Sequence, residues 1–168
     1  MKDLKTLCIL FVSLLVFSCS SDDDGGDSVG SPEFAATIMG GPFNNYSSVF
    51  DYYDANSDND RVTIIITDTN QNIIRLFMNN TGGYSKGVSK EIGNVDTGGF
   101  VTAALFRDQQ AQLTYNAFEG NISITEYRED PEDENYTVIS GTFSIKATTN
   151  TGTEINMNGS FSNMSFFD

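Results

Sequence analysis

Oxygen-bearing side chains occupy every second position of residues 54–60, which read DANSDND. Alternating carboxylate and amide groups of this kind coordinate calcium in the first half of an EF-hand loop. The candidate ligands here are Asp54, Asn56, Asp58 and Asp60. The glycine expected at the sixth position and the glutamate expected at the twelfth are replaced by Asn59 and Ile65, so half of the ligand set is missing. The pattern favours a solvated hairpin loop between Tyr53 and Arg61, with weak calcium binding as the alternative.

A cysteine at position 19 ends an apolar run near the start of the chain. Residues 1–18 begin with positive charge and continue as an apolar stretch of signal-peptide length, shorter than the roughly 20 residues that span a bilayer. The run ends in Val16-Phe17-Ser18-Cys19, which resembles the lipobox of bacterial lipoproteins. The resemblance implies that residues 1–18 are removed and that Cys19 carries acyl chains, which anchor the protein to a membrane. The alternatives are a secretory signal cut elsewhere and a membrane anchor.

Serine and aspartate residues follow this cysteine directly: Ser20, Ser21, Asp22, Asp23 and Asp24. They resemble the serine–acidic export signal of Bacteroidota lipoproteins, which implies a location on the outer face of the outer membrane. The alternative is a solvated tether. Residues 19–31 are small, acidic and rich in glycine, and they predict a flexible linker. Within them, Asp27-Ser28-Val29 resembles an O-glycosylation acceptor of the same bacteria, which makes Ser28 a candidate for modification.

The amino-acid composition excludes several kinds of catalytic site. The chain has no histidine and, after residues 1–18, a single cysteine. These residues therefore cannot form Ser–His–Asp or Cys–His catalytic groups or a Cys/His zinc site. No glycine-rich nucleotide-binding motif is present, and we expect no cofactor. An enzyme built from these residues would depend on paired carboxylates, as glycosidases do.

Acidic charge limits the partners. The formal net charge is −14 at pH 7, and it becomes one unit more negative without residues 1–18, which hold Lys2, Lys5 and Asp3. We therefore expect no basic face for nucleic acid, and contact with a membrane only through the lipid. A second acidic run, residues 126–134, contains Pro131 and predicts a solubilising hairpin tip. The alternative is a loop that faces a partner or a cation.

Residues 32–168 predict one β-rich domain. Short β-branched and aromatic runs alternate with turn residues, and no helical stripe longer than two turns is found. The expected strands are 62–67, 73–78, 100–106, 112–117, 122–127, 139–147 and 155–161. One face of the later strands is apolar and the other is polar, which is typical of antiparallel sheet. We predict an all-β antiparallel sandwich or barrel-like sandwich of about 8–10 strands.

The last two expected strands predict a specific contact. The turn residues 150–152 join them, and Phe143 and Phe161 lie on their apolar faces. If the two strands form a hairpin, Phe143 should lie inside, opposite Gly159, with its ring over the partner strand.

The C-terminal part of the chain resembles a family of Bacteroidota lipoproteins of unknown function. The matching residues are Ile124, Thr125 and Tyr127, then residues 139–145 (ISGTFSI), then Gly159, Phe161, Ser162 and Asn163. Residues 81–84 (TGGY) resemble a turn in the middle of that family's domain. The resemblance implies a β-rich extracytoplasmic domain and no activity.

These observations favour a binding or structural module tethered to the cell surface, which is not an enzyme. Its ligand would be a glycan, a peptide or another envelope protein. The alternative is a carboxylate-based enzyme that acts on saccharides. An aromatic concentration, Phe43, Tyr46, Phe50, Tyr52 and Tyr53, is interpreted as core, with the rim of a glycan or peptide site as the alternative.

Overall fold

The structure is a computed structural model that describes residues 29–58 and 60–167. It is all-β, and the described residues contain no helix that could cross a membrane. The strands are β1 (Glu33–Gly40), β2 (Phe43–Asp58), β3 (Arg61–Asp68), β4 (Ile73–Asn79), β5 (Ser89–Glu91), β6 (Ala103–Asp108), β7 (Leu113–Glu129), β8 (Tyr136–Thr148) and β9 (Glu154–Phe167). This confirms the predicted fold class and the approximate number of strands.

The strands form one antiparallel sheet that closes on itself. Their order is β5-β7-β6-β4-β3-β2-β1-β9-β8, and β8 also pairs with β7. Apart from the short β5, each strand therefore pairs with the strands before and after it in the chain, and β9 returns to pair with β1. The barrel-like form of the predicted sandwich is the one that the chain adopts.

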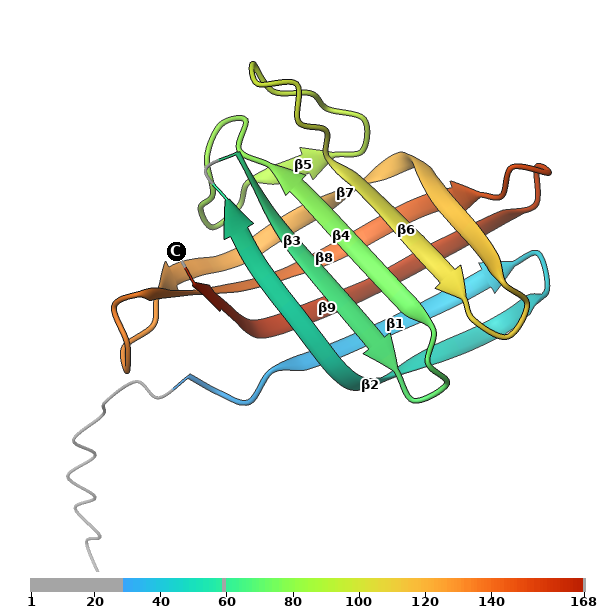
Figure 1. The fold of residues 1–168 in the computed structure, drawn as a ribbon, viewed down its shortest axis with the longest axis horizontal. Coiled ribbons are helices and arrows are strands. Elements are labelled where there is room, and N and C mark those ends of the chain that lie inside the picture. Colours follow the sequence, from blue (N-terminus) through green and yellow to red (C-terminus); the bar gives the residue numbers. More distant parts are fainter. Residues whose placement is uncertain (1–28, 59, 168) are drawn as a thin grey trace, which may run out of the picture.

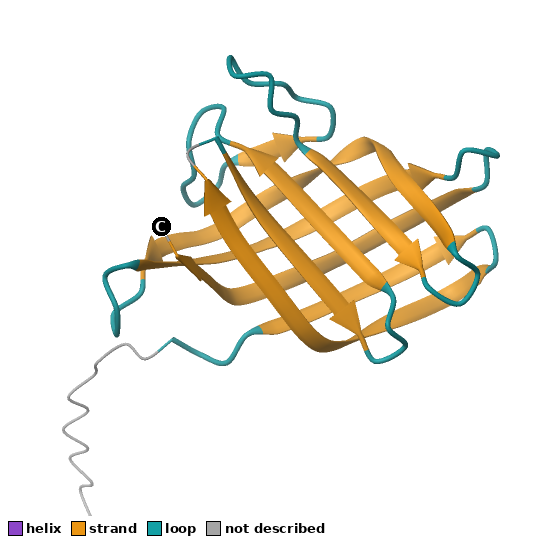
Figure 2. Cartoon of the chain, viewed as in Figure 1, coloured by secondary structure: helices purple, strands orange, loops and turns teal. Residues whose placement is uncertain are grey.

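Two long strands, β2 and β7, turn the sheet into two layers. The first part of β2 pairs with β1 up to Val49, and from Phe50 onward β2 pairs with β3. Figures 1 and 2 show one layer of β2, β3, β4 and β6 crossing a second layer of β7, β8, β9 and β1 at a steep angle. Strand β7 changes direction where its pairing with β8 is irregular, between Ala117 and Glu119 and next to Gly120, whose φ is 122°.

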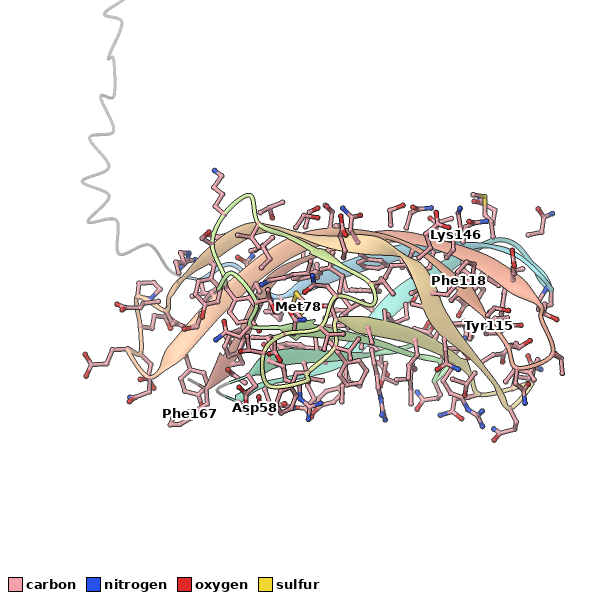
Figure 3. The ribbon with its side chains drawn as sticks, turned by 90° about the horizontal axis from the view of Figure 1, so that it is seen from above. Asp58, Met78, Tyr115, Phe118, Lys146 and Phe167 are labelled. Carbon is pink, nitrogen blue, oxygen red and sulfur yellow. The ribbon has the colours of Figure 1, made fainter. Side chains whose placement is uncertain are left out.

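The space between the two layers is filled with side chains. Alternate residues of each strand point inward, as the period-two pattern requires. Figure 3 shows Met78 between the layers, whereas Lys146 lies on the outer side. The largest fully buried side chains include Tyr115, Phe106 and Phe161. The described interior is thus a packed apolar core rather than an open chamber.

Aromatic rings packed over glycines join β8 to β9, and one of these contacts, Phe143 with Gly159, was predicted. Phe143 lies opposite Gly159, and Phe161 lies opposite Gly141. A Cβ added at Gly159 would lie 2.5 Å from Cζ of Phe143, and one added at Gly141 would lie 2.5 Å from Cζ of Phe161. Phe34 of β1 stacks on Phe143, with ring centroids 5.8 Å apart. The Phe143 ring therefore also contacts β1, which is the other strand that pairs with β9.

Three strand expectations differ from the structure. The segments expected as separate strands at 112–117 and 122–127 belong to the single strand β7, because a bulge next to Gly120 bends the strand without ending it. Strands β1 and β2, near the start of the domain, were not expected from the sequence. Residues 100–102 precede β6 and belong to the loop before it.

We expect Phe143→Ala to lower the free energy of unfolding by about 3–5 kcal/mol, because it removes a buried ring that contacts two strands. Thr142→Ser, on the exposed outer face of the same strand, should change it by less than about 0.5 kcal/mol. Urea unfolding followed by tyrosine fluorescence measures both values. Similar losses for the two variants would show that both faces of β8 are buried there.

Candidate ligand-binding site at the turn end

Hairpin turns gather at one end of the molecule (Figure 1), and three of them bound the candidate site. They join β1 to β2, β3 to β4, and β6 to β7. Pro32 precedes β1, so the chain enters the domain at the opposite end and reaches this end only after the eight residues of β1. Eight strand residues extend about 25 Å. The candidate site and the entry point of the chain therefore lie at opposite ends of the sheet.

A buried carboxylate, Asp68, organises the turn between β3 and β4. The residue is 1% exposed. Its Oδ1 accepts hydrogen bonds from the backbone N–H groups of Asn70 at 2.8 Å and Asn72 at 2.9 Å. A carboxylate that accepts the free N–H groups of a turn is the common way in which aspartate fixes such turns. The aspartate and asparagine residues between the two predicted strands thus have a structural role.

The same carboxylate joins this turn to β2. Its Oδ2 accepts hydrogen bonds from the hydroxyl of Tyr46 at 2.6 Å and from that of Ser48 at 3.3 Å. The Tyr46 oxygen in turn accepts from the Nδ2 atoms of Asn70 and Asn72, each at 2.9 Å. Burial, and then the hydrogen bond to Asp68, raise the pKa of Tyr46 above its usual value. Tyr46 therefore stays a neutral hydroxyl at physiological pH.

The third turn is tied to the same network through one amide. Oδ1 of Asn72 accepts a hydrogen bond from the backbone N–H of Gln109 at 3.0 Å. Within that turn, Oδ1 of Asp108 accepts from the N–H of Ala111 at 2.9 Å. The turn between β3 and β4 is thus joined by side-chain hydrogen bonds to the turn between β6 and β7 and to strand β2.

Between these turns lies a cavity of about 460 Å³, called here the end hollow. It is lined by Phe43, Tyr46, Asn70, Asn72, Asp108 and Gln110. Asn72 and Asp108 are buried, the two aromatic residues are half-buried, and Asn70 and Gln110 are exposed at the rim. The end hollow therefore combines aromatic surface with amide and carboxylate groups that are held in place.

A buried hydroxyl without a hydrogen-bond partner lies beside the end hollow. The Oη of Tyr115 is one of two such side-chain atoms found among residues 29–58 and 60–167. The Tyr115 ring packs 5.9 Å from that of Phe43, and burial together with the charge of Asp108 raises its pKa. Unsatisfied buried polar atoms are uncommon and need a physical explanation. The ring of Phe43 and the charge of Asp108, which act on Tyr115, both belong to residues that line the end hollow. The unsatisfied hydroxyl therefore belongs to a residue that packs against this cavity.

The chemistry of the end hollow suits a saccharide. A sugar ring presents a C–H face, which an aromatic ring can contact, and hydroxyl groups that both donate and accept hydrogen bonds. Amide groups can do both as well, and a carboxylate accepts. A pocket with apolar and aromatic surface and a few placed polar groups is the usual form of a small-ligand site.

The opposite end of the sheet is closed by the loop between β4 and β6. Lys90 is 2% exposed, and its Nζ donates hydrogen bonds to the carbonyl oxygens of Thr81 at 2.6 Å and Gly83 at 2.7 Å. The ammonium also lies 4.7 Å from the ring centroid of Tyr84. Burial lowers the pKa of Lys90. The TGGY segment thus has a structural role, because it holds a buried cation that fixes the loop.

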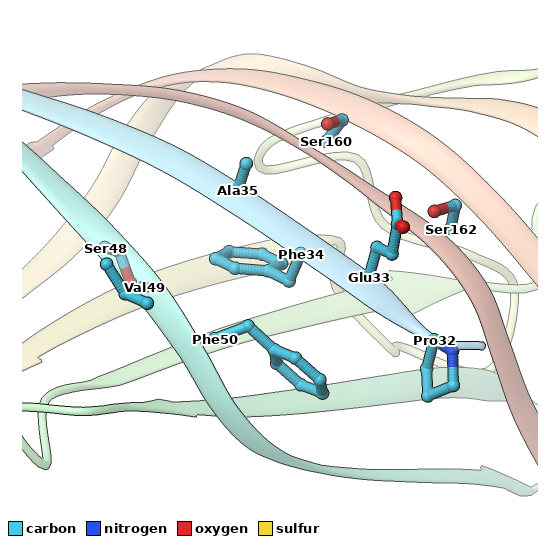
Figure 4. Close-up of a pocket in the computed structure, with 9 residues that line it drawn as sticks. All are labelled: Pro32, Glu33, Phe34, Ala35, Ser48, Val49, Phe50, Ser160 and Ser162. Carbon is cyan, nitrogen blue, oxygen red and sulfur yellow. The ribbon is translucent and has the colours of Figure 1, made fainter.

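A second cavity, of about 420 Å³, opens where β2 leaves β1 (Figure 4). The pairing of these strands ends at Ala35 and Val49, and Phe34 and Phe50 lie along the gap. Its polar side chains are Glu33 and three serines, one of which, Ser48, already donates to Asp68. This cavity follows from the bend in β2, and it offers fewer fixed polar groups than the end hollow.

The residues considered for calcium do not converge. Asp54, Asn56 and Asp58 lie at alternate exposed positions of β2, which continues to Asp58 instead of forming the long loop expected from the sequence. Alternate residues of a strand are about 7 Å apart. Oδ1 of Asp58 accepts hydrogen bonds from the N–H groups of Asp60 and Arg61, which closes the turn to β3. Within the described ranges, no group of three or more acidic, histidine or cysteine residues could hold a metal.

The acidic run at 126–134 is divided between β7 and a turn. Glu126 lies on β7, where hydrogen bonds from Arg128 at 2.7 Å and from Ser140 at 2.9 Å lower the pKa of its carboxyl. Asp130 and Asp133 accept hydrogen bonds from backbone N–H groups of their own turn. These contacts support the expected hairpin tip, which is confined to residues 130–135.

The remaining predicted site residues are Cys19, Ser20, Ser21, Asp22, Asp23, Asp24 and Ser28. All of them lie outside the residues that the structure describes. Their roles in lipidation, export and glycosylation stay predictions.

Sequence reasoning did not identify several residues of the end hollow. Asn70 and Asn72 were recognised only as turn residues, and Asp108 and Gln110 were not singled out. A usable signal was the density of asparagine and aspartate between the strands 62–67 and 73–78, because such residues fix turns by hydrogen bonding their own backbone. Phe43 and Tyr46 were noted, and the structure shows that they line the rim and also pack on the core.

Comparisons with protein-family models, with curated proteins and with solved structures found no match to this chain.

We expect Asp68→Ala to lower the free energy of unfolding by about 3–5 kcal/mol, because it leaves the hydroxyl of Tyr46 and the backbone N–H groups of Asn70 and Asn72 without their common acceptor. Asp96→Ala is the matched control. Asp96 also accepts two backbone N–H groups within a turn, but it is only half-buried, so about 1 kcal/mol is expected. Urea unfolding gives both values, and amide hydrogen exchange at Asn70 and Asn72 reports the turn itself. Slow exchange at these amides in Asp68→Ala would contradict the assigned role.

Proposed function

We propose that this chain is a lipid-anchored, non-enzymatic binding module of the bacterial outer membrane, and that it binds a saccharide at the end hollow. The lipobox ending in Cys19 and the export-like run Ser20, Ser21, Asp22, Asp23 and Asp24 support an anchored, outward-facing location in Bacteroidota. The β-rich extracytoplasmic domain implied by the family resemblance agrees with the all-β structure.

The observation that carries the proposal is the position and lining of the end hollow. Phe43 and Tyr46 supply aromatic surface, and Asn70, Asp108 and Gln110 supply hydrogen-bonding groups. The turns that line the hollow lie at the end of the sheet opposite to the start of β1 (Figure 1), and the proposed tether enters at that start. A tethered domain would therefore present this site away from the membrane.

Binding is favoured over catalysis by the state of the carboxylates. A glycosidase needs two carboxyl groups about 5–10 Å apart, one on each side of the bond that it cleaves. Asp108 is the one carboxylate that lines the end hollow. The nearby Asp68 is buried, and both of its oxygens accept hydrogen bonds from the turn and from β2. The site therefore supports a binding function better than a two-carboxylate mechanism.

Cys19→Ser should abolish incorporation of labelled palmitate and release the protein from the membrane fraction, because the acyl chains provide the anchor. Metabolic labelling and fractionation of cells that carry the full-length chain measure this. Replacement of the neighbouring Ser18 by Ala, which keeps a small residue before the cysteine, is the matched control. Labelling that persists in Cys19→Ser would rule out this anchor.

The mature chain should bind selected members of a printed array of neutral and acidic oligosaccharides. Gln110→Ala should weaken that binding by about 3- to 10-fold, because it removes one exposed hydrogen-bonding group. Phe43→Leu should also weaken it, since leucine keeps apolar packing but lacks an aromatic face. Thr142→Ser, on the outer face of β8, is the control. A blank array, or equal binding by all three variants, would contradict the proposed function.

A further inference from the structure

A second hollow lies on the other side of the turn between β6 and β7. It has a volume of about 340 Å³ and is called here the arginine hollow. Its lining residues are Ile73, Arg75, Leu105, Arg107, Gln109 and Thr114, from the outer face of β4, β6 and β7 and from the turn. Gln109 lines this hollow, whereas its chain neighbours Asp108 and Gln110 line the end hollow. The two hollows therefore adjoin along one hairpin turn.

The strand register brings the two arginines together. Arg75 pairs with Leu105, and Arg107 pairs with Ile73. The arginines are thus diagonal neighbours on adjacent strands, a separation that long side chains readily bridge. Their cross-strand partners, Ile73 and Leu105, are apolar and line the same hollow.

Internal hydrogen bonds fix one of these groups. Nη1 of Arg107 donates to the carbonyl oxygen of Gln112 at 2.8 Å and to Oγ1 of Thr114 at 3.0 Å, and Nη2 donates to Oε1 of Gln112 at 2.7 Å. A guanidinium has five N–H groups, so the Nε–H and one Nη2–H of Arg107 remain. Arg107 is therefore held in place with donors to spare.

The other guanidinium has an unsatisfied donor. Nε of Arg75 is, with Oη of Tyr115, one of the two buried side-chain atoms without a hydrogen-bond partner among the described residues. Its cross-strand neighbours are Ile65 on one side and Leu105 on the other, neither of which can accept a hydrogen bond. A buried donor of this kind has lost its hydrogen bonds to water without replacing them. Arg75 also lines the arginine hollow, where an anionic oxygen would be attracted by its charge.

Arg75 and Arg107 are two of the few basic residues in a chain with a net charge of −14. Arg61, Arg128 and Lys146 each form an ion pair with a carboxylate. Within the described ranges, the ion pairs found include neither Arg75 nor Arg107. Asp54 of β2 pairs with Ile65 of β3, which in turn pairs with Arg75 of β4. Asp54 and Arg75 are therefore two strand spacings apart, or about 10 Å.

We propose that the arginine hollow binds the carboxylate or sulfate group of an acidic saccharide, whose neighbouring sugar occupies the end hollow. This inference rests on the proposed function, because it names the class of saccharide that the site takes. Arginine forms paired hydrogen bonds with carboxylate and with sulfate-like oxyanions, and such charge-assisted bonds are about twice as strong as neutral ones. The chain is acidic overall and repels polyanions in general, so two adjacent arginines give the described part of the domain a local site of opposite charge.

The test compares three immobilised polysaccharides with the mature chain. Dextran sulfate carries sulfate groups, and polygalacturonate carries carboxylate groups. Unmodified dextran is the uncharged counterpart of dextran sulfate. We expect binding to at least one acidic polymer and none to dextran, with weakening as salt is raised. Arg75→Gln should weaken it by at least about 10-fold, which corresponds to the loss of a charge-assisted hydrogen bond. Among residues 29–58 and 60–167, Arg75 takes part in none of the ion pairs found, and the melting temperature checks that the fold is kept.

Lys86→Gln is the matched control, because it removes the same charge from an exposed residue in the loop between β4 and β6. Equal loss in Lys86→Gln and Arg75→Gln would overturn the inference, since it would indicate general charge attraction. Equal binding of dextran and dextran sulfate, unchanged in Arg75→Gln, would also overturn it but would leave the saccharide site at the end hollow standing. If neither acidic polymer binds, the inference fails, whereas the proposed function fails only if the oligosaccharide array is blank or the variants of the end hollow bind it equally. A preference between the two acidic polymers identifies the anion.

Discussion

The carboxylate of Asp68 is the interaction on which the proposed site depends. It is buried, and it accepts hydrogen bonds from the turn between β3 and β4 and from Tyr46 and Ser48 of β2. Through Asn72 the same network reaches the turn between β6 and β7. Without this carboxylate the turn between β3 and β4 would lose its acceptor and its link to β2. The walls of the end hollow that Tyr46, Asn70 and Asn72 form would then no longer be held together.

The closed sheet makes such a network possible, because it brings turns that are far apart in the sequence to one end. A chain with no cysteine beyond Cys19 cannot close its domain with a disulfide. The packing of buried side chains has to hold the closed sheet together instead. The rings of Phe143 and Phe161 lie over Gly159 and Gly141, and Phe34 stacks on Phe143, so the strands β8, β9 and β1 share one continuous contact. The long bent strands β2 and β7 then carry the sheet from one layer to the other.

Much of the fold could be predicted from the sequence, because alternation of apolar and polar residues is a local signal. The strands near 62–67, 73–78, 139–147 and 155–161, and the contact of Phe143 with Gly159, were all predicted from it. Strand β2 was missed because its inward residues change partner at the bend near Phe50, which interrupts the alternation. The site was largely missed for a different reason. Arg75 and Arg107, or Tyr46 and Asp108, meet only through strand register, and one sequence does not reveal which strands become neighbours.

The most direct test of the account is an NMR titration of the ¹⁵N-labelled mature chain with the oligosaccharide that binds best on the array. The account predicts that chemical-shift changes concentrate in the three turns at 40–43, 68–73 and 108–113, and in the Nε–H signals of Arg75 and Arg107. Changes centred on the loop between β4 and β6, or on the cavity beside Phe34 and Phe50, would contradict it.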